Sequence, residues 1–119
     1  MKLMVTGGRH YADEEQLYAV LDEIHSKTPI DLLIHGNAGG ADTLAKRWCR
    51  ERKVDHKPFP ADWGKFGRAA GPMRNQFMVD DQPDVVVAFP GGRGTSDAVK
   101  RARKKNIMVI QVPDRENKS

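Results

Sequence analysis

The sequence predicts an α/β domain in which helices cover both faces of a five-stranded, mainly parallel sheet. Short apolar runs alternate along the 119 residues with longer segments whose apolar residues recur at helical spacing. Glycine-rich turns follow several of the apolar runs. Strict alternation of strand and helix favours parallel strands, because a parallel pair needs a long, usually helical, connection between its two strands.

The first half of the chain contributes three strands and two helices. We expect the strands at residues 2–6, 31–34 and 54–59, and the helices at residues 13–26 and 41–52. Asp13 is placed to cap the first helix, because its carboxylate can accept a hydrogen bond from a free amide of the first turn. Pro58 and Pro60 predict that the third strand lies at an edge of the sheet, since proline cannot donate to a strand ladder.

The second half of the chain contributes two helices and two strands. We expect an irregular segment at residues 61–71, a helix at 72–79, a strand at 84–89, a helix from about residue 95 and a last strand at 107–112. Three consecutive valines at 85–87 indicate a strand that is buried on both faces. Residues 1–112 then form a single domain, and residues 113–119 form a polar tail that we expect to fray.

Right-handed crossovers give these five strands the order 3-2-1-4-5, which makes the domain a Rossmann-like α/β/α sandwich. In such sheets a ligand binds outside the carboxyl ends of the strands, where the strand order reverses. Glycine-rich loops follow the three strands that meet there. The candidate ligand-binding residues of these loops are Gly7, Gly8 and Arg9, then Gly36, Gly39, Gly40 and Asp42, and finally Pro90, Gly91, Gly92, Arg93, Gly94 and Thr95.

This combination of residues favours a ligand that carries phosphate. Glycine lets an anion approach the backbone closely, and a helix that begins in such a loop offers free amides and a positive dipole end. The hydroxyl of Thr95 and the guanidinium groups of Arg9 and Arg93 can add further hydrogen bonds. Neither GxGxxG after the first strand nor GxxxxGK[ST] occurs, so the common dinucleotide and triphosphate motifs are absent.

Composition excludes several other classes of function. No apolar run approaches the roughly 20 residues that span a bilayer, so we expect no membrane partner. The single cysteine, Cys49, suits a reducing compartment, and we expect a cytoplasmic protein. The single cysteine and the four histidines show no metal-binding spacing, and we expect neither a metal site nor a cofactor. The net charge of +4 allows a nucleic-acid partner, but no aromatic residues interleave with the basic cluster at residues 100–105 to support one.

Several motifs, in this order along the chain, resemble those of the YspA-like group of the SLOG superfamily. They are Val5-Thr6-Gly7-Gly8-Arg9, Ile34-His35-Gly36, Gly39-Gly40-Ala41-Asp42, Phe59-Pro60-Ala61-Asp62-Trp63, Gly71-Pro72-Met73-Arg74-Asn75 and Ala88-Phe89-Pro90-Gly91-Gly92-Arg93-Gly94-Thr95. The resemblance extends over residues 2–112. It implies a Rossmann-like nucleotide-binding domain of bacteria or phages and, by analogy with Lonely Guy proteins of the superfamily, a homodimer.

The resemblance also raises an enzymatic alternative. Lonely Guy enzymes hydrolyse the bond between base and ribose 5′-monophosphate, and their signature PGGxGTxxE is matched here from Pro90 to Thr95. The closing glutamate falls at Ala98, and Asp97 is the acidic neighbour. The companion arginine of those enzymes is matched by Arg74. If the chain is a nucleoside-phosphate N-glycosidase, its catalytic residues are therefore Asp97 and Arg74.

The sequence favours binding or sensing of a phosphate-bearing nucleotide, or of a nucleotide-derived small molecule, over this hydrolase. It also favours that function over nucleic-acid binding, which the resemblance implies because the superfamily includes the DNA-processing protein DprA. Three side chains retain two interpretations. Arg74 is either a surface ion-pair partner or a ligand contact. Asp42 either caps a helix or contacts a ribose or base. Trp63 either covers the sheet edge or stacks on a base.

Overall fold

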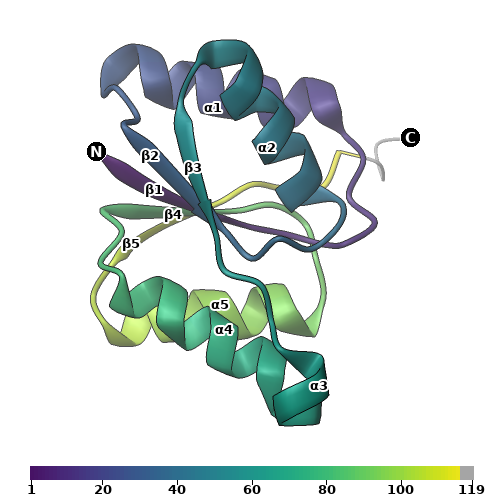
Figure 1. Ribbon diagram of the computed structural model, residues 1–119. Helices are drawn as coiled ribbons and strands as arrows, with labels where there is room; N and C mark the ends of the chain where they lie inside the picture. Colours follow the sequence, from purple (N-terminus) through teal and green to yellow (C-terminus); the bar gives the residue numbers. More distant parts are fainter. Residues whose placement is uncertain (116–119) are drawn as a thin grey trace.

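A five-stranded sheet, parallel throughout, forms the centre of the protein (Figure 1). The computed structural model describes residues 1–115. Its strand order β3-β2-β1-β4-β5 confirms the predicted order and the Rossmann-like class. The strands are β1 (Lys2–Thr6), β2 (Leu32–His35), β3 (Asp55–Pro58), β4 (Val85–Ala88) and β5 (Met108–Gln111).

Helices cover the sheet on both sides. On one face lie α1 (Glu14–Lys27) and α2 (Ala41–Arg52), and on the other lie α4 (Ala70–Asp80) and α5 (Arg93–Lys104) (Figure 1). Side chains alternate along β1, so Leu3 and Val5 pack beneath α1 and α2, whereas Met4 packs in the core beside α4 and α5. Both faces of the central strands are therefore buried, as the valine run of β4 predicted.

The segment at residues 61–71 is more regular than we expected. It contains the short helix α3 (Trp63–Phe66), a 3-10 turn (Gly67–Ala69) and the beginning of α4. The carboxylate of Asp62 caps α3 by accepting a hydrogen bond from the Lys65 amide at 3.0 Å. The helix expected from residue 72 begins at Ala70, and Pro72 lies within its first turn, where a missing N–H costs no helical hydrogen bond.

The C-terminal segment of the described chain is held against the beginning of α1. Asp13 caps α1 as predicted, through a hydrogen bond of 3.1 Å from the Gln16 amide. The Asp13 carboxylate also pairs with Arg115 at 2.7 Å, and Gln16 donates to the carbonyl of Pro113 at 2.9 Å. Residues 113–115 of the predicted polar tail thus run beside α1, and residues 116–119 lie outside the described part.

The sheet has two exposed edge strands. All four residues of β3 are exposed, in agreement with the edge position that its prolines predicted, and β5 forms the opposite edge. Within residues 1–115, no helix has the length and apolar character needed to cross a membrane.

Candidate functional site

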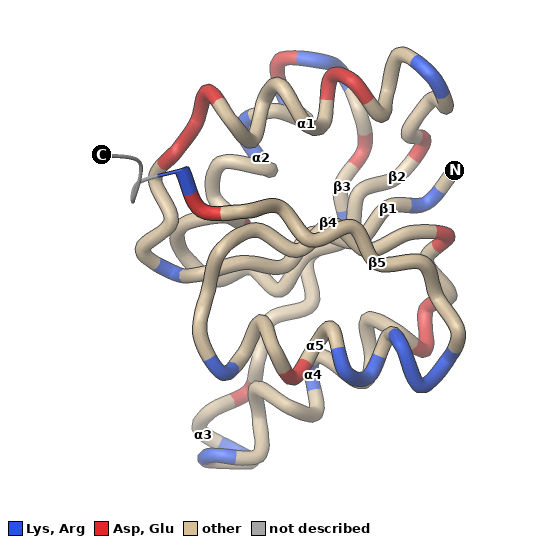
Figure 2. The backbone as a smooth tube through the Cα atoms, turned by 180° about the vertical axis from the view of Figure 1, so that it is seen from behind, with Lys and Arg blue, Asp and Glu red and all other residues tan. Residues whose placement is uncertain are grey.

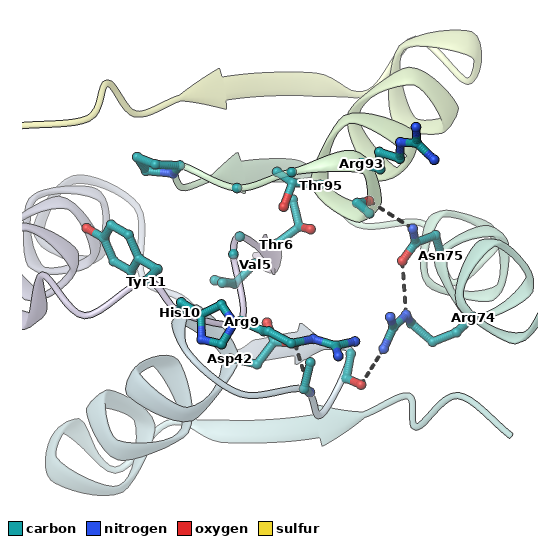
Figure 3. Close-up of a pocket in the computed structure, with 18 of the residues that line it drawn as sticks. Val5, Thr6, Arg9, His10, Tyr11, Asp42, Arg74, Asn75, Arg93 and Thr95 are labelled. Carbon is teal, nitrogen blue, oxygen red and sulfur yellow. Dashed lines mark hydrogen bonds between the residues drawn. The ribbon is translucent and has the colours of Figure 1, made fainter. Parts of the chain in front are cut away.

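A cavity of about 500 Å³ opens at the carboxyl ends of β1 and β4, where the strand order reverses (Figure 3). Loops after β1, β2 and β4 line it, together with the first half of α4. Twelve of the predicted site residues meet in this cavity. They are Gly7, Gly8, Arg9, Gly36, Asp42, Arg74, Pro90, Gly91, Gly92, Arg93, Gly94 and Thr95.

The loops that follow β1 and β4 pack closely against each other through their backbones. The Gly8 amide donates a hydrogen bond of 2.9 Å to the carbonyl of Pro90. A Cβ atom at Gly91 would overlap the hydroxyl of Thr95 and would approach the Gly8 nitrogen to 2.6 Å. Glycine is therefore required at position 91 because one loop lies directly on the other, whether or not a ligand is bound.

The beginning of α2 is covered by the first loop. The Gly8 carbonyl accepts a hydrogen bond of 3.2 Å from the amide of Ala41, the first residue of α2. Gly40 has φ +60°, and a Cβ atom there would overlap this same carbonyl. Of the predicted residues in this loop, Gly39 and Gly40 do not line the cavity. This helix end is thus occupied by protein, although the sequence suggested that it could hold an anion.

The beginning of α5, in contrast, is open toward the cavity. Gly92 occupies the cap position, and no side chain caps this helix. A Cβ atom at Gly92 or Gly94 would meet nothing within 4 Å. The first amides of a helix have no partner within the helix and carry its positive dipole end, so this terminus attracts anions.

Two arginines face each other on the side of the cavity nearest α4. Arg74 is held by two hydrogen bonds, from Nη1 to the carbonyl of Gly36 at 2.5 Å and from Nε to the Asn75 carboxamide at 3.0 Å. Burial lowers the pKa of Arg74, partly offset by the charge of Asp42. The guanidinium of Arg9 points toward that of Arg74, whereas the Arg93 side chain points away from both (Figure 3).

Asn75 connects α4 to α5 and was not among the predicted site residues. Only 4% of it is exposed, and it lines the cavity. Its Nδ2 donates to the carbonyl of Gly94 at 3.1 Å and to Oδ2 of Asp97 at 3.0 Å, while its Oδ1 accepts from Arg74. Asn75 therefore fixes the beginning of α5 relative to Arg74. Its place beside Arg74, as a polar residue on a largely apolar helix, is the sequence signal that could have identified it.

Asp97 is held away from the cavity. Its Oδ2 accepts hydrogen bonds from Asn75 and from Nε of Arg101, the latter at 2.8 Å, and these contacts hold the pKa of Asp97 below its usual value despite partial burial. Ala98, at the position of the family glutamate, is fully buried in the core between the sheet, α4 and α5. Neither position presents a carboxylate to the cavity.

Asp42 is a buried carboxyl group in the cavity wall. Only 6% of it is exposed, and its Oδ2 accepts a hydrogen bond of 3.1 Å from the Ala38 amide. Its Oδ1 is buried without a hydrogen-bond partner among residues 1–115. Burial raises the pKa of Asp42 to about 6, against the opposing effects of the Ala38 and Gly36 amides and of the charges of Arg74 and Lys46.

A second cavity of about 460 Å³ adjoins the first and shares Arg9 and Arg74 with it. Trp63 lines this second cavity and is 51% exposed. The six-membered ring of its indole lies against Gly71 of α4, where a Cβ atom would approach Cη2 to 3.1 Å. Trp63 therefore rests on α4 while much of its surface stays open.

Seven further residues that line the first cavity were not among the predicted ligand-binding residues: Val5, Thr6, His10, Tyr11, Ala38, Met78 and Asp114. Thr6 is the last residue of β1, and its position before the glycine pair is the signal that could have identified it. Tyr11 packs against Phe89 with ring centroids 5.3 Å apart. Asp114 reaches the cavity only because the chain after β5 returns past the first loop, which no local pattern reveals. Within residues 1–115, no three His, Cys, Asp or Glu side chains are grouped to hold a metal ion.

Comparison with known proteins agrees with this architecture. Residues 1–66 match the family described as the YspA, cpYpsA-related SLOG family. A protein of Mycobacterium phage D29, named Gene 61 protein, is 37% identical to this chain over 123 aligned residues, which cover 96% of this chain and 98% of that protein. Both matches include the loops after β1 and β2 and the covered beginning of α2. The chain therefore belongs to the YspA, cpYpsA-related SLOG family.

Proposed function

We propose that this chain binds a phosphate-bearing nucleotide, or a small molecule derived from one, in the cavity at the carboxyl ends of β1 and β4. Membership of the SLOG family indicates a nucleotide-related role in general. The finer proposal is that the domain captures or senses its ligand and does not alter it. The ligand's phosphate would lie at the beginning of α5, between Thr95 and the two facing arginines.

The observation that carries this proposal is the open, uncapped beginning of α5 opposite Arg9 and Arg74. Free amides and guanidinium groups together supply the charge-assisted hydrogen bonds that phosphate oxygens accept. Arg74 is well suited to this task because Gly36 and Asn75 already fix its orientation, so little side-chain freedom is lost on binding. Trp63 in the adjoining cavity offers a stacking surface to the base.

Thermal denaturation with a panel of ligands tests the proposal. A ligand at about 100 times its dissociation constant adds roughly 2.7 kcal/mol to the free energy of unfolding, which appears as a clear rise in Tm. We expect nucleoside mono- and diphosphates, dinucleotides or ADP-ribose-like compounds to raise Tm, and free nucleosides to do so much less. The proposed site is wrong if no phosphate-bearing compound raises the Tm of wild type, so that wild type and Arg74→Ala respond alike to every compound.

Binding without hydrolysis is the second part of the proposal. Hydrolysis of the N-glycosidic bond needs a carboxylate near the anomeric carbon, and Asp97 is held by Asn75 and Arg101 outside the cavity. A misplacement of about 1 Å can cost roughly a hundredfold in rate. We expect no release of free base when AMP is incubated with the protein and analysed by chromatography. Turnover on the order of 1 s⁻¹ that disappears in Asp97→Asn would identify a hydrolase instead.

A further inference from the structure

Asp42 differs from the other residues of the cavity because only one of its two carboxylate oxygens accepts a hydrogen bond from the protein. Oδ2 is satisfied by the Ala38 amide at 3.1 Å, but Oδ1 is buried and has no partner among residues 1–115. Roughly 90% or more of buried polar groups in proteins have a partner, so an exception calls for a specific reason. A bound ligand that donates to Oδ1 is one such reason, since Asp42 forms part of the cavity wall.

Neighbouring cations do not supply this missing partner. Arg74 affects Asp42 through its charge, but its guanidinium donates its hydrogen bonds to Gly36 and Asn75. Lys46 also contributes a favourable charge, yet its ammonium donates to the Asn37 side chain at 3.2 Å. The backbone amides of Ala38 and Gly36 also favour the ionised carboxylate, but only the Ala38 amide lies in hydrogen-bond geometry with it, so Oδ1 keeps its acceptor capacity.

An ionised carboxylate accepts hydrogen bonds and donates none. A phosphate group is also a negatively charged acceptor, so it is not the partner of Oδ1. The group that reaches it must be a neutral donor carried by the same ligand. A sugar hydroxyl fits this requirement, because it lies a few bonds from the phosphate of a nucleotide. In dinucleotide-binding Rossmann domains an acidic residue in the corresponding part of the chain binds a ribose hydroxyl. Here β2 ends in His35-Gly36, and Asp42, in the first turn of α2, is the acidic residue that follows it.

We propose that Oδ1 of Asp42 accepts a hydrogen bond from a ribose hydroxyl, so that the cavity prefers ribose phosphates to their deoxy counterparts. This inference rests on the proposed function, because it assumes that the phosphate of the same ligand lies at the beginning of α5. The phosphate supplies most of the electrostatic attraction, and Asp42 supplies the discrimination between sugars. Asp114, the other carboxylate that lines the cavity, comes from the segment after β5.

Calorimetric titration tests the inference with five probes: AMP, 2′-deoxy-AMP, 3′-deoxy-AMP, 2′,3′-dideoxy-AMP and inorganic pyrophosphate. For wild type we expect AMP to bind roughly 10- to 100-fold more tightly than the dideoxy compound, the range typical of one hydrogen bond to a charged group. The two monodeoxy compounds show which hydroxyl is responsible. In Asp42→Asn, which keeps an oxygen for the Ala38 amide, we expect this preference to fall close to one while pyrophosphate binds as before.

Asp80→Asn is the matched control, because Asp80 ends α4 far from the cavity and pairs with Lys105 at 2.7 Å. It should keep the preference of wild type for AMP. Equal binding of all four monophosphates by wild type would overturn the role of Asp42, as would a preference that survives in Asp42→Asn. In those cases pyrophosphate binding would still support the phosphate site. Failure of every monophosphate and of pyrophosphate to bind would reject the proposed function and the inference together.

Discussion

Individual glycines in the three loops serve different purposes, and the space around each one distinguishes them. Gly91 and Gly40 allow one loop to lie on another, because a Cβ atom at either would overlap a neighbouring loop or side chain. Gly92 and Gly94 have no such neighbour, and both lie at the open beginning of α5. A substitution at the first kind of glycine changes the fold locally, whereas one at the second kind changes what can approach the helix.

Gly92→Val should therefore weaken nucleotide binding at least tenfold and leave the free energy of unfolding within about 0.5 kcal/mol of wild type. Its side chain would occupy the space that we assign to the phosphate. Gly64→Ala is a control at another open glycine, which lines neither the first nor the second cavity. Leu33→Ala, in the buried core, should instead cost about 2–5 kcal/mol of stability. If Gly92→Val destabilises the protein as much as Leu33→Ala, the glycine serves the fold and not the ligand.

Burial of Asp42 has a consequence for stability as well as for binding. Its pKa is raised from 3.8 to about 6 in the folded protein, so its ionisation opposes folding. The favourable contribution of the protonated group is complete below the unfolded pKa and is lost as pH rises through about 6, a loss of about 3 kcal/mol. The charges of Arg74 and Lys46 reduce this loss but do not remove it.

We therefore expect Asp42→Asn to be more stable than wild type at pH 7–8 by about 1–3 kcal/mol, an advantage that disappears near pH 4. Urea denaturation of both proteins across this pH range measures the difference between their free energies of unfolding. The other carboxylates contribute equally to both proteins and so do not affect this difference. An advantage that does not vary with pH would show that Asp42 is not titrating abnormally. If Asp42→Asn is more stable than wild type and also loses the preference for ribose, then the buried carboxylate of Asp42 lowers stability and is needed for ligand recognition.

At the scale of elements, the end of β2 is fixed by a pair of histidines. The buried His35 accepts a hydrogen bond at Nδ1 from the Asn37 amide and contacts Nδ1 of His56 through Nε2, both at 3.0 Å. Because Nδ1 is an acceptor, the proton of neutral His35 lies on Nε2 and is donated to His56. This arrangement orients the backbone just before the loop that leads from Gly36 to Asp42 in the first turn of α2.

The pH dependence of this pair has the opposite sign to that of Asp42. Burial, together with the charges of His56 and Lys46, lowers the pKa of His35 to about 4. The contribution of neutral His35 is complete above the unfolded pKa of about 6.5 and is lost as pH falls toward 4, a loss of about 3 kcal/mol. Compared with His35→Gln, wild type should therefore lose more stability between pH 7 and pH 4 in urea denaturation. Parallel pH profiles for the two proteins would contradict the burial of a neutral imidazole.

The short helix α3 gives a prediction about the base of the ligand. If Trp63 stacks on the base, Trp63→Ala should weaken AMP binding roughly tenfold, since stacking contributes about 1–3 kcal/mol per base, and should leave pyrophosphate binding unchanged. Trp63→Phe should retain most of the affinity because it keeps an aromatic face. Should Trp63→Ala lower Tm without affecting any ligand, the residue is only a cover over Gly71 and α4.

Across the whole molecule, the densest group of basic residues lies away from the cavity, along the second half of α5 (Figure 2). Several of them already have partners. Arg101 pairs with Asp97 at 2.8 Å, Lys105 pairs with Asp80 at 2.7 Å, and Arg103 donates to the Gln111 side chain at 2.9 Å. The two carboxylate pairs reduce the positive charge of this solvated helix face, whereas Lys100, Arg103 and Lys104 form no ion pair within residues 1–115.

We accordingly expect single-stranded DNA to bind weakly at low salt and to be released at about 0.15 M salt, where phosphate contacts with few cations are screened. Fluorescence anisotropy of a labelled oligonucleotide at several salt concentrations measures this. AMP should not displace the DNA that binds at low salt, because the basic face of α5 and the cavity are different surfaces. Tight DNA binding at 0.15 M salt that AMP does displace would favour a nucleic-acid-binding function.

The order of the strands, the edge position of β3 and the cap at Asp13 were all predictable from the sequence. Each depends on a signal that lies within a short stretch of chain: apolar periodicity, prolines that cannot donate, or a carboxylate before a helix. Right-handed crossovers then turn the order of elements into a sheet topology, and the topology places the glycine loops after β1, β2 and β4 at one edge. The location of the cavity, and most of the residues that line it, follow from these local signals.

Tertiary contacts alone determine which helix ends and side chains face that cavity. The Gly8 carbonyl covers the beginning of α2, while α5 stays open, although both helices begin after glycine-rich loops. Asp97 is turned aside by Asn75, a residue 22 positions away, and Arg74 is oriented by the carbonyl of Gly36, 38 positions away. These outcomes depend on how helices rotate and loops pack against partners that are remote in sequence. Propensity and spacing describe the chain locally, and so they contain no information about which of two similar helix ends another loop will cover.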